Sequence, residues 1–141
     1  MKCEVEFDED GLVARIARAS RDILRRAGAY VRRVAQRKVV TSPKPSTPGQ
    51  PPHSRKGLLK RAILFASDGD KSVLVGPGFN FVGPSMSAHE FGGKYRRERY
   101  PKRPLMGPAI KESAPHVAKM WKDAVKQVLD RIDRIHRIPQ S

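Results

Sequence analysis

The chain has 141 residues and one cysteine, and its 29 basic against 14 acidic residues give a formal net charge of +15. This length suits one domain with a single core, and the lone Cys3 excludes an intramolecular disulfide and a four-cysteine zinc site. So positive a chain is expected to contact nucleic acid, an acidic protein surface or an anionic membrane.

The first 40 residues are predicted to form an N-terminal segment and a long helix. Residues 1–10 alternate acidic and apolar side chains and lack the apolar core of a secretory signal, which predicts a protein made and used in the cytoplasm. No apolar run is long enough to cross a bilayer. Over residues 10–39, apolar side chains recur at three- and four-residue steps: Leu12, Ile16, Ala19, Ile23, Ala27, Tyr30 and Val34.

This pattern is typical of an amphipathic helix. Its thirty residues span about 45 Å, more than the core of so small a domain needs. A second apolar edge, Leu24 and Val31, suits either contact with another subunit or a wider core face. The arginines on the remaining surface suit either a solvated face or one that meets DNA or a partner.

Residues 41–56 are rich in proline, which excludes a helix interior and a central strand. The prolines stand among Ser, Thr and Gly and are Pro43, Pro45, Pro48, Pro51 and Pro52. The composition predicts an extended arm that reaches about 40 Å in polyproline geometry, enough to touch a neighbouring subunit. A linker that is disordered in the free protein is the alternative.

Residues 57–107 are predicted to form a small, mostly antiparallel sheet. Residues 59–65 and 71–75 read as strands that flank Ser67-Asp68-Gly69-Asp70, where Asp-Gly tolerates the positive φ of a tight turn. Residues 79–82 fit either a short strand or an apolar loop. A basic loop follows, in which Tyr95 and Tyr100 are interleaved with basic residues, as at nucleic-acid surfaces and at protein interfaces.

Two basic clusters are candidates for contact with DNA or an acidic partner. The first belongs to a stretch without acidic residues between Asp22 and Asp68, and the second is the loop just described. The candidate residues are Arg32, Arg33, Arg37, Lys38, Arg55, Lys56, Lys94, Arg96, Arg97 and Arg99.

Residues 108–138 are predicted to form a C-terminal helix that packs on the sheet beside the first helix. Pro108 fits a first turn, where a missing N–H costs nothing, and Pro115 is expected to kink or restart the helix. Trp121 is expected in the core or at an interface.

The sequence predicts no enzyme, no cofactor and no metal site. The four histidines are scattered, the acidic residues are few and dispersed, and no glycine-rich loop ends in Gly-Lys-Ser or Gly-Lys-Thr. His89 and Glu90 are adjacent, so their side chains point in different directions on a strand, and Glu90 is expected to be a buried or interface anchor for one of the surrounding arginines.

Four short motifs occur in a fixed order along the chain. They are Thr47-Pro48-Gly49-Gln50-Pro51-Pro52, Gly57-Leu58-Leu59, His89-Glu90-Phe91-Gly92 and Arg103-Pro104-Leu105-Met106-Gly107-Pro108-Ala109-Ile110. Together they resemble the head-tail joining family of tailed phages, the small virion morphogenesis or tail-completion proteins. The Leu-Met-Gly of the last motif departs from the commoner aromatic form of that family.

This resemblance implies a structural α+β virion protein, assembled in the host cytoplasm and located at the phage neck or tail. It implies a homo-oligomeric ring, with 6 or 12 copies expected, that meets neighbouring neck or tail-tube proteins and encloses the DNA passage. The proline-rich arm would lie over the adjacent subunit. The motif residues that would fix the fold or an interface are Gly57, Leu58, Glu90, Phe91, Gly92, Arg103, Pro104, Pro108 and Ala109.

Two other functions fit parts of the sequence. The charge alone suits a free-standing nucleic-acid-binding protein, although no helix-turn-helix, zinc-finger or RNA-binding signature accompanies it. The basic amphipathic first helix would suit a membrane surface, but its apolar stripe is rich in alanine and lacks tryptophan and phenylalanine, so we expect no membrane partner.

Overall fold

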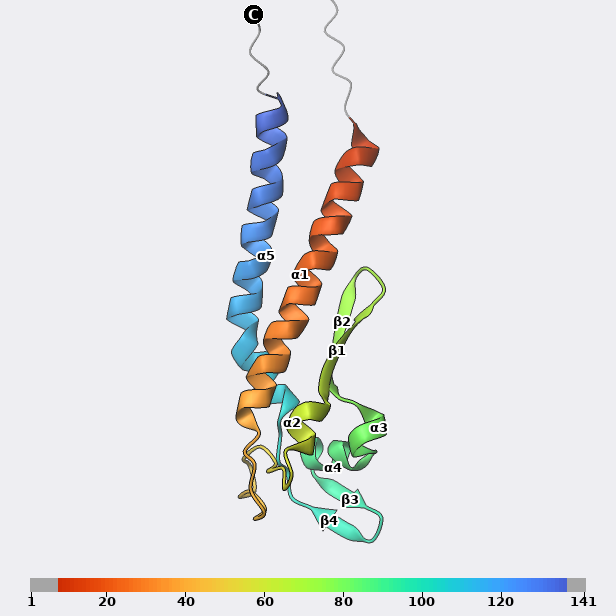
Figure 1. The fold of residues 1–141 in the computed structure, drawn as a ribbon, viewed down its shortest axis with the longest axis vertical. Coiled ribbons are helices and arrows are strands. Elements are labelled where there is room, and N and C mark those ends of the chain that lie inside the picture. Colours follow the sequence, from red (N-terminus) through yellow and green to blue (C-terminus); the bar gives the residue numbers. More distant parts are fainter. Residues whose placement is uncertain (1–7, 137–141) are drawn as a thin grey trace, which may run out of the picture.

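The computed structural model describes residues 8–136 of the chain. Two long helices, α1 (Glu9–Lys38) and α5 (Met106–His136), run side by side along the long axis (Figure 1). The hairpin of β1 (Ile63–Asp68) and β2 (Ser72–Pro77) lies on the other side of α1. The short elements gather at one end, which we call the base: α2 (Leu58–Ala62), α3 (Phe79–Val82), α4 (Ser85–Phe91), β3 (Gly93–Tyr95) and β4 (Glu98–Tyr100).

Helix α1 confirms the periodicity prediction. The Asp8 side chain caps it by accepting a hydrogen bond from the Gly11 N–H at 3.0 Å. Acidic residues in the first turn and basic residues in the last complement the helix dipole. The predicted stripe faces inward from Ile23 to Val34, where Ile23, Ala27 and Val34 are buried, whereas Ile16 nearer the start of the helix is exposed.

The predicted hairpin is confirmed, with an antiparallel register that pairs Ile63 with Pro77 and Asp68 with Ser72. Gly69 has φ 63°, which explains the Asp-Gly turn. The face of the hairpin that carries Phe65 and Val73 packs closely on α1. A Cβ on Gly28 of α1 would lie 2.8 Å from the Phe65 Cδ2 and the Val73 Cγ2.

Two strand predictions need correction. Residues 58–62 form helix α2 and not the start of a strand, because Leu59 and Ala62 are both buried, at a spacing of three that suits a helix face. Residues 79–82 form the short helix α3 and are neither a strand nor a loop. The basic loop is ordered as the β3–β4 hairpin.

The structure does not show the predicted extended arm. The proline-rich segment closes on itself, since Thr41 and Ser54 form a β-bridge and the Ser54 N–H donates to the Val40 carbonyl at 2.9 Å. The loop is also attached to the base, where the Gly49 N–H donates to the Lys102 carbonyl at 2.8 Å. Prolines have no N–H, so Gly49, between the prolines, and Ser54, after the last of them, supply these donors.

The core lies at the base, where the last turns of α1 meet the first turn of α5. Its buried members are Val34, Ala35, Val39, Leu59, Ile63, Leu105 and Ala109. Leu105, just before α5, and Ala109 of α5 belong to the same buried cluster as Ile63 of β1, so the C-terminal helix packs on the rest of the fold. Helix α5 continues through Pro115 as one element.

The α+β class is therefore confirmed, with a long helix at each end of the described chain and two small antiparallel sheets between them. Among residues 8–136, no helix is long and apolar enough to span a membrane.

Candidate functional site

Three of the four sequence motifs meet at one place, which we call the motif junction. The Glu90 carboxylate, in α4, accepts hydrogen bonds from the N–H groups of Leu105 at 2.7 Å, Met106 at 3.0 Å and Gly107 at 2.8 Å. The first N–H groups of a helix have no partner within it, and a negative charge at this end is favourable. Glu90 therefore caps α5.

Glu90 does not anchor an arginine within the described chain, contrary to what the buried alternative predicted. Within residues 8–136 the ion pairs are Arg21–Asp70 and Lys38–Glu112, and Glu90 takes part in neither. Its carboxylate is occupied by backbone donors fifteen to seventeen residues away.

Arg103 ties the junction to the proline-rich loop. Its Nε donates to the Ser46 carbonyl at 3.0 Å, and its backbone N–H donates to the His89 carbonyl at 2.6 Å. The Ser46 residue is buried. Hydrogen bonds thus join the proline-rich loop, α4 and the start of α5 at this point.

The remaining motif residues have separate positions. Gly57 has φ 69° and Gly92 has φ 73°, a backbone region that favours glycine. Pro108 lies in the first turn of α5, as predicted. Leu58 and Phe91, in contrast, are largely exposed, so they contribute to the surface and not to the core.

His89 is half-buried at the motif junction. Burial, with a smaller contribution from the positive Arg103 side chain, lowers the pKa of His89 from its usual value. Its Nδ1 is buried without a hydrogen-bond partner, and its ring contacts the Tyr100 ring edge to face, with centroids 5.0 Å apart. This environment favours the neutral imidazole.

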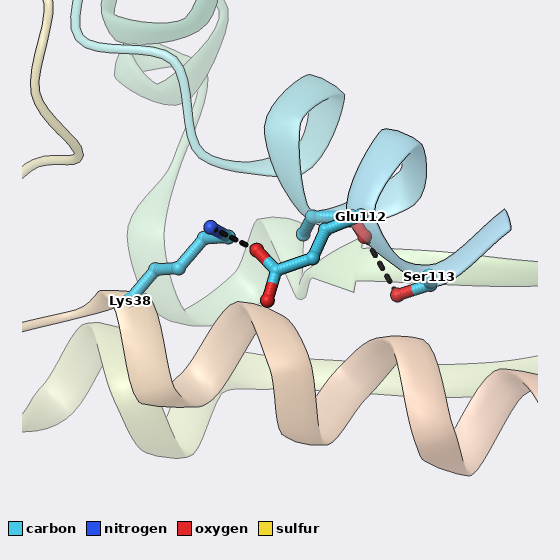
Figure 2. Close-up of polar contacts among 4 residues, drawn as sticks. Lys38, Glu112 and Ser113 are labelled. Carbon is cyan, nitrogen blue, oxygen red and sulfur yellow. Dashed lines mark hydrogen bonds and ion pairs between the residues drawn. The ribbon is translucent and has the colours of Figure 1, made fainter. Parts of the chain in front are cut away.

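Two of the candidate basic residues have structural contacts. The Arg32 Nε donates to the Ile63 carbonyl at 2.8 Å. Lys38, at the end of α1, forms an ion pair with Glu112 of α5 (Figure 2). Beside it, the buried Ser113 hydroxyl donates to the Ala109 carbonyl within the helix. These two cations join elements of the fold.

The other candidate basic residues are exposed, but the structure distributes them over different elements. They are Arg33 and Arg37 on α1, Arg55 and Lys56 before α2, and Lys94, Arg96, Arg97 and Arg99 on the β3–β4 hairpin. On this hairpin Lys94 pairs directly with Arg99. Like charges opposite each other are unfavourable, so an anionic partner would stabilise this pair.

Two apolar surfaces remain exposed. The hairpin face is formed by Leu64 and Leu74 of the β1–β2 hairpin and by Phe81 of α3, and Leu64 and Phe81 both approach Gly78. Leu74 is 63% and Phe81 72% exposed. The helix groove lies between the distal halves of α1 and α5 and is lined by Leu12, Ile16, Trp121, Val125 and Leu129. Trp121 is 43% exposed there, which favours the interface alternative.

Sequence reasoning missed a third feature, which we call the arginine cleft. It lies between the same helix halves and is lined by Arg15, Arg18, Arg26, Arg131 and Arg134. On each helix the arginines are three to eight residues apart, a spacing that places them on one side of that helix. The sequence alone contains this signal. Only the structure shows that the two helices bring the arginines of α1 and those of α5 together.

No known protein family, characterised protein or solved structure matches the chain. Within residues 8–136, no three His, Cys, Asp or Glu side chains are grouped as a metal ion would need.

Proposed function

We propose that this chain is a structural virion protein of a tailed phage that forms an oligomeric ring at the neck. The observation that carries the proposal is the presence of two distinct exposed apolar surfaces, the hairpin face and the helix groove, on different parts of one small chain. A two-fold dimer needs one self-complementary surface. A ring built head to tail needs two different ones.

The exposed area is consistent with two neighbours per subunit. The chain exposes 11159 Å², whereas a compact monomer of its mass exposes about 7,300 Å². The twelve residues outside 8–136 can contribute at most about 1,900 Å² of the difference, the surface of an equal mass of chain with nothing buried. About 2,000 Å² remains, and two standard interfaces bury about 1,600 Å² of one subunit.

The motif order connects this assembly to the phage neck. Residues of the motifs that resemble head-tail joining proteins form the motif junction, which holds α5 on the base. In the proposed ring the hairpin face of one copy packs into the helix groove of the next. Neighbouring neck or tail-tube proteins bind above and below, and DNA passes through the lumen.

The test uses two variants that each lack one surface. Leu74→Glu with Phe81→Glu charges the hairpin face, and Trp121→Glu with Leu129→Glu charges the helix groove. The native mass of each is measured by light scattering over a range of concentrations. Each variant alone should be monomeric, while an equimolar mixture should form a heterodimer through the one intact pair of surfaces.

The matched control is Lys122→Glu, an exposed position on α5 that does not line the groove. It should keep the native mass of the unchanged chain. A self-associating single variant would indicate an isologous contact and contradict the head-to-tail ring, and an unchanged chain that is monomeric at every concentration would count against any ring formed by this chain alone.

A second candidate function is a free-standing nucleic-acid-binding protein, favoured by the Lys94–Arg99 pair on the exposed β3–β4 hairpin. It predicts that an isolated subunit binds a short duplex with an affinity that falls steeply as salt rises, because neutralised phosphates release counterions. Lys94→Ala with Arg99→Ala should reduce the salt slope by about two. An affinity that is independent of salt would exclude this function.

A further inference from the structure

The arginine cleft has a volume of about 650 Å³. Its apolar lining comes from both helices and consists of Ala19, Ile23, Ala124, Val128 and Ile132, which also line the helix groove. Among the described residues that line it, Asp22 is the one acidic side chain, against five arginines. The cleft thus combines an apolar floor with a strongly positive rim.

Within the described part of the chain, no ion pair neutralises the arginines of the cleft. Neither of the ion pairs within residues 8–136 includes any of the five. Like charges that converge on one concave site repel one another, and an anionic occupant removes this repulsion. An occupant that also carries apolar side chains would cover the floor.

The chain itself contains a segment with these properties. Residues 2–7 have the sequence Lys-Cys-Glu-Val-Glu-Phe, so Glu4 and Glu6 alternate with Val5 and Phe7. In an extended segment, successive side chains point to opposite sides. Glu4 and Glu6 would then face the arginine rim while Val5 and Phe7 cover the apolar floor.

The dimensions also agree. Six extended residues span about 20 Å. The cleft extends along α1 from Arg15 to Arg26, a distance of about 17 Å at the helical rise per residue.

We propose that the arginine cleft binds residues 2–7 of a neighbouring copy. This inference rests on the proposed ring. The segment is joined to Asp8, whose side chain caps α1, so it leaves the helix at the end beyond Arg15. Within one chain a folded-back segment would reach the near end of the cleft and leave Arg26 uncovered, whereas a neighbour's segment lies along its full length.

The unique cysteine provides the test. Cys3 lies in the segment, and Gln127→Cys places a second thiol in the lining of the cleft. Under mild oxidation, a disulfide between Cys3 of one copy and the introduced thiol of the next should produce a ladder of covalent multiples of the 15.8 kDa chain on a non-reducing gel. Peptide mapping identifies the linked cysteines.

Two controls accompany this variant. Lys122→Cys is exposed on the same helix but outside the cleft and should give no such ladder. Cys3→Ser combined with Gln127→Cys removes the segment's thiol and should abolish the ladder. A bond between Cys3 and the introduced thiol found within single chains would overturn the proposal, and so would the absence of any bond between these two thiols.

A second measurement does not depend on ring formation. A fluorescent peptide of residues 1–8 is titrated onto a chain that lacks residues 2–7, and binding is followed by anisotropy. Arg131→Glu with Arg134→Glu should weaken binding about tenfold, because two attractive charge contacts with the peptide are lost. The same peptide with Glu4→Gln and Glu6→Gln should bind comparably weakly.

The outcomes separate the two proposals. A ring that forms without peptide binding overturns the cleft inference and leaves the proposed function standing. Peptide binding by a chain that never assembles supports the cleft as a site for the segment and overturns the proposed ring. A short duplex that binds the cleft in place of the peptide would assign it to nucleic acid and overturn the inference.

Discussion

At the base of the molecule α1 and α5 share a closed core, whereas their distal halves leave apolar side chains half exposed. Leu105 and Ala109 are completely buried at the base, while Leu129, further along α5, is 56% exposed. Both halves of each helix are amphipathic. This difference shows that the apolar stripe of each helix is fully covered by the rest of the chain at the base only. The base therefore supplies stability, and the distal halves are available for assembly.

The largest effect should come from the base. Leu105→Ala removes a side chain with no solvent exposure and should lower the free energy of unfolding by about 3 kcal/mol. Leu129→Ala, the same change at the half-exposed end, should cost less than about 1 kcal/mol in the isolated chain. Urea unfolding of both variants checks this, and equal losses would contradict the comparison.

The second effect concerns the connection between the base and α5. Glu90→Gln removes the charge that accepts three N–H groups and should cost about 2 kcal/mol. Asp130→Asn is the matched control, because this exposed carboxylate on α5 should change stability by less than about 0.5 kcal/mol. Thermal and urea unfolding measure both. If Glu90→Gln and Asp130→Asn changed the free energy of unfolding equally, the Glu90 cap would contribute little to stability.

The third effect tests how closely the hairpin approaches α1. Gly28→Ala places a Cβ 2.8 Å from Phe65 and Val73, and the resulting overpacking should outweigh the gain in helix propensity, with a net loss of about 1 kcal/mol in urea unfolding. Gly76→Ala meets open space in the same hairpin and serves as the control. A stabilising Gly28→Ala would show that the hairpin moves away from α1 easily.

A smaller effect should appear with pH at the motif junction. The pKa of His89 is lowered in the folded state by burial and by Arg103, so the unfolded chain takes up its proton first as the pH falls below about 6.5. His89 therefore reduces stability on acidification and has no such effect above this pH. In urea unfolding, His89→Gln should lose less stability between about pH 7.5 and about pH 5.5 than the unchanged chain. An equal loss would show that His89 is not the group responsible.

The smallest effect is expected for the ion pair that joins α1 to α5. Glu112→Gln breaks the contact with Lys38, and because Glu112 is mostly exposed, the cost should be about 0.5 kcal/mol. A double-mutant cycle with Lys38→Met isolates the coupling. The coupling should decrease in high salt, and a salt-independent value would indicate a contact other than charge.

Part of the fold could be predicted from local pattern. Both long helices follow from the periodic spacing of their apolar residues, and the β1–β2 turn follows from Asp68-Gly69. The strand assigned to residues 59–65 was wrong in its first half, because a short apolar run has no period that separates helix from strand.

The candidate site depended on contacts that are distant in sequence. Nothing near Glu90 shows that its partners are the N–H groups of residues 105–107, and nothing in the proline-rich loop shows that Gly49 is bonded to Lys102. The arginine cleft is divided between two helices that are far apart in the sequence, so its charge becomes visible only when they pair.

The β3–β4 hairpin is a suitable place to insert an epitope, because hydrogen bonds fix the chain on both sides of it. His89 precedes the hairpin and Arg103 follows it, and the Arg103 N–H donates to the His89 carbonyl. Glu90 also holds the start of α5, so the chain is fixed before and after the hairpin. Arg96 has φ 56°, an unfavourable conformation for a residue with a Cβ, and replacing it with a glycine-rich epitope would relieve this. Doubling the length of such a loop costs about 0.6 kcal/mol. If the protein is part of a virion as proposed, an epitope inserted here would let electron microscopy locate it on the particle.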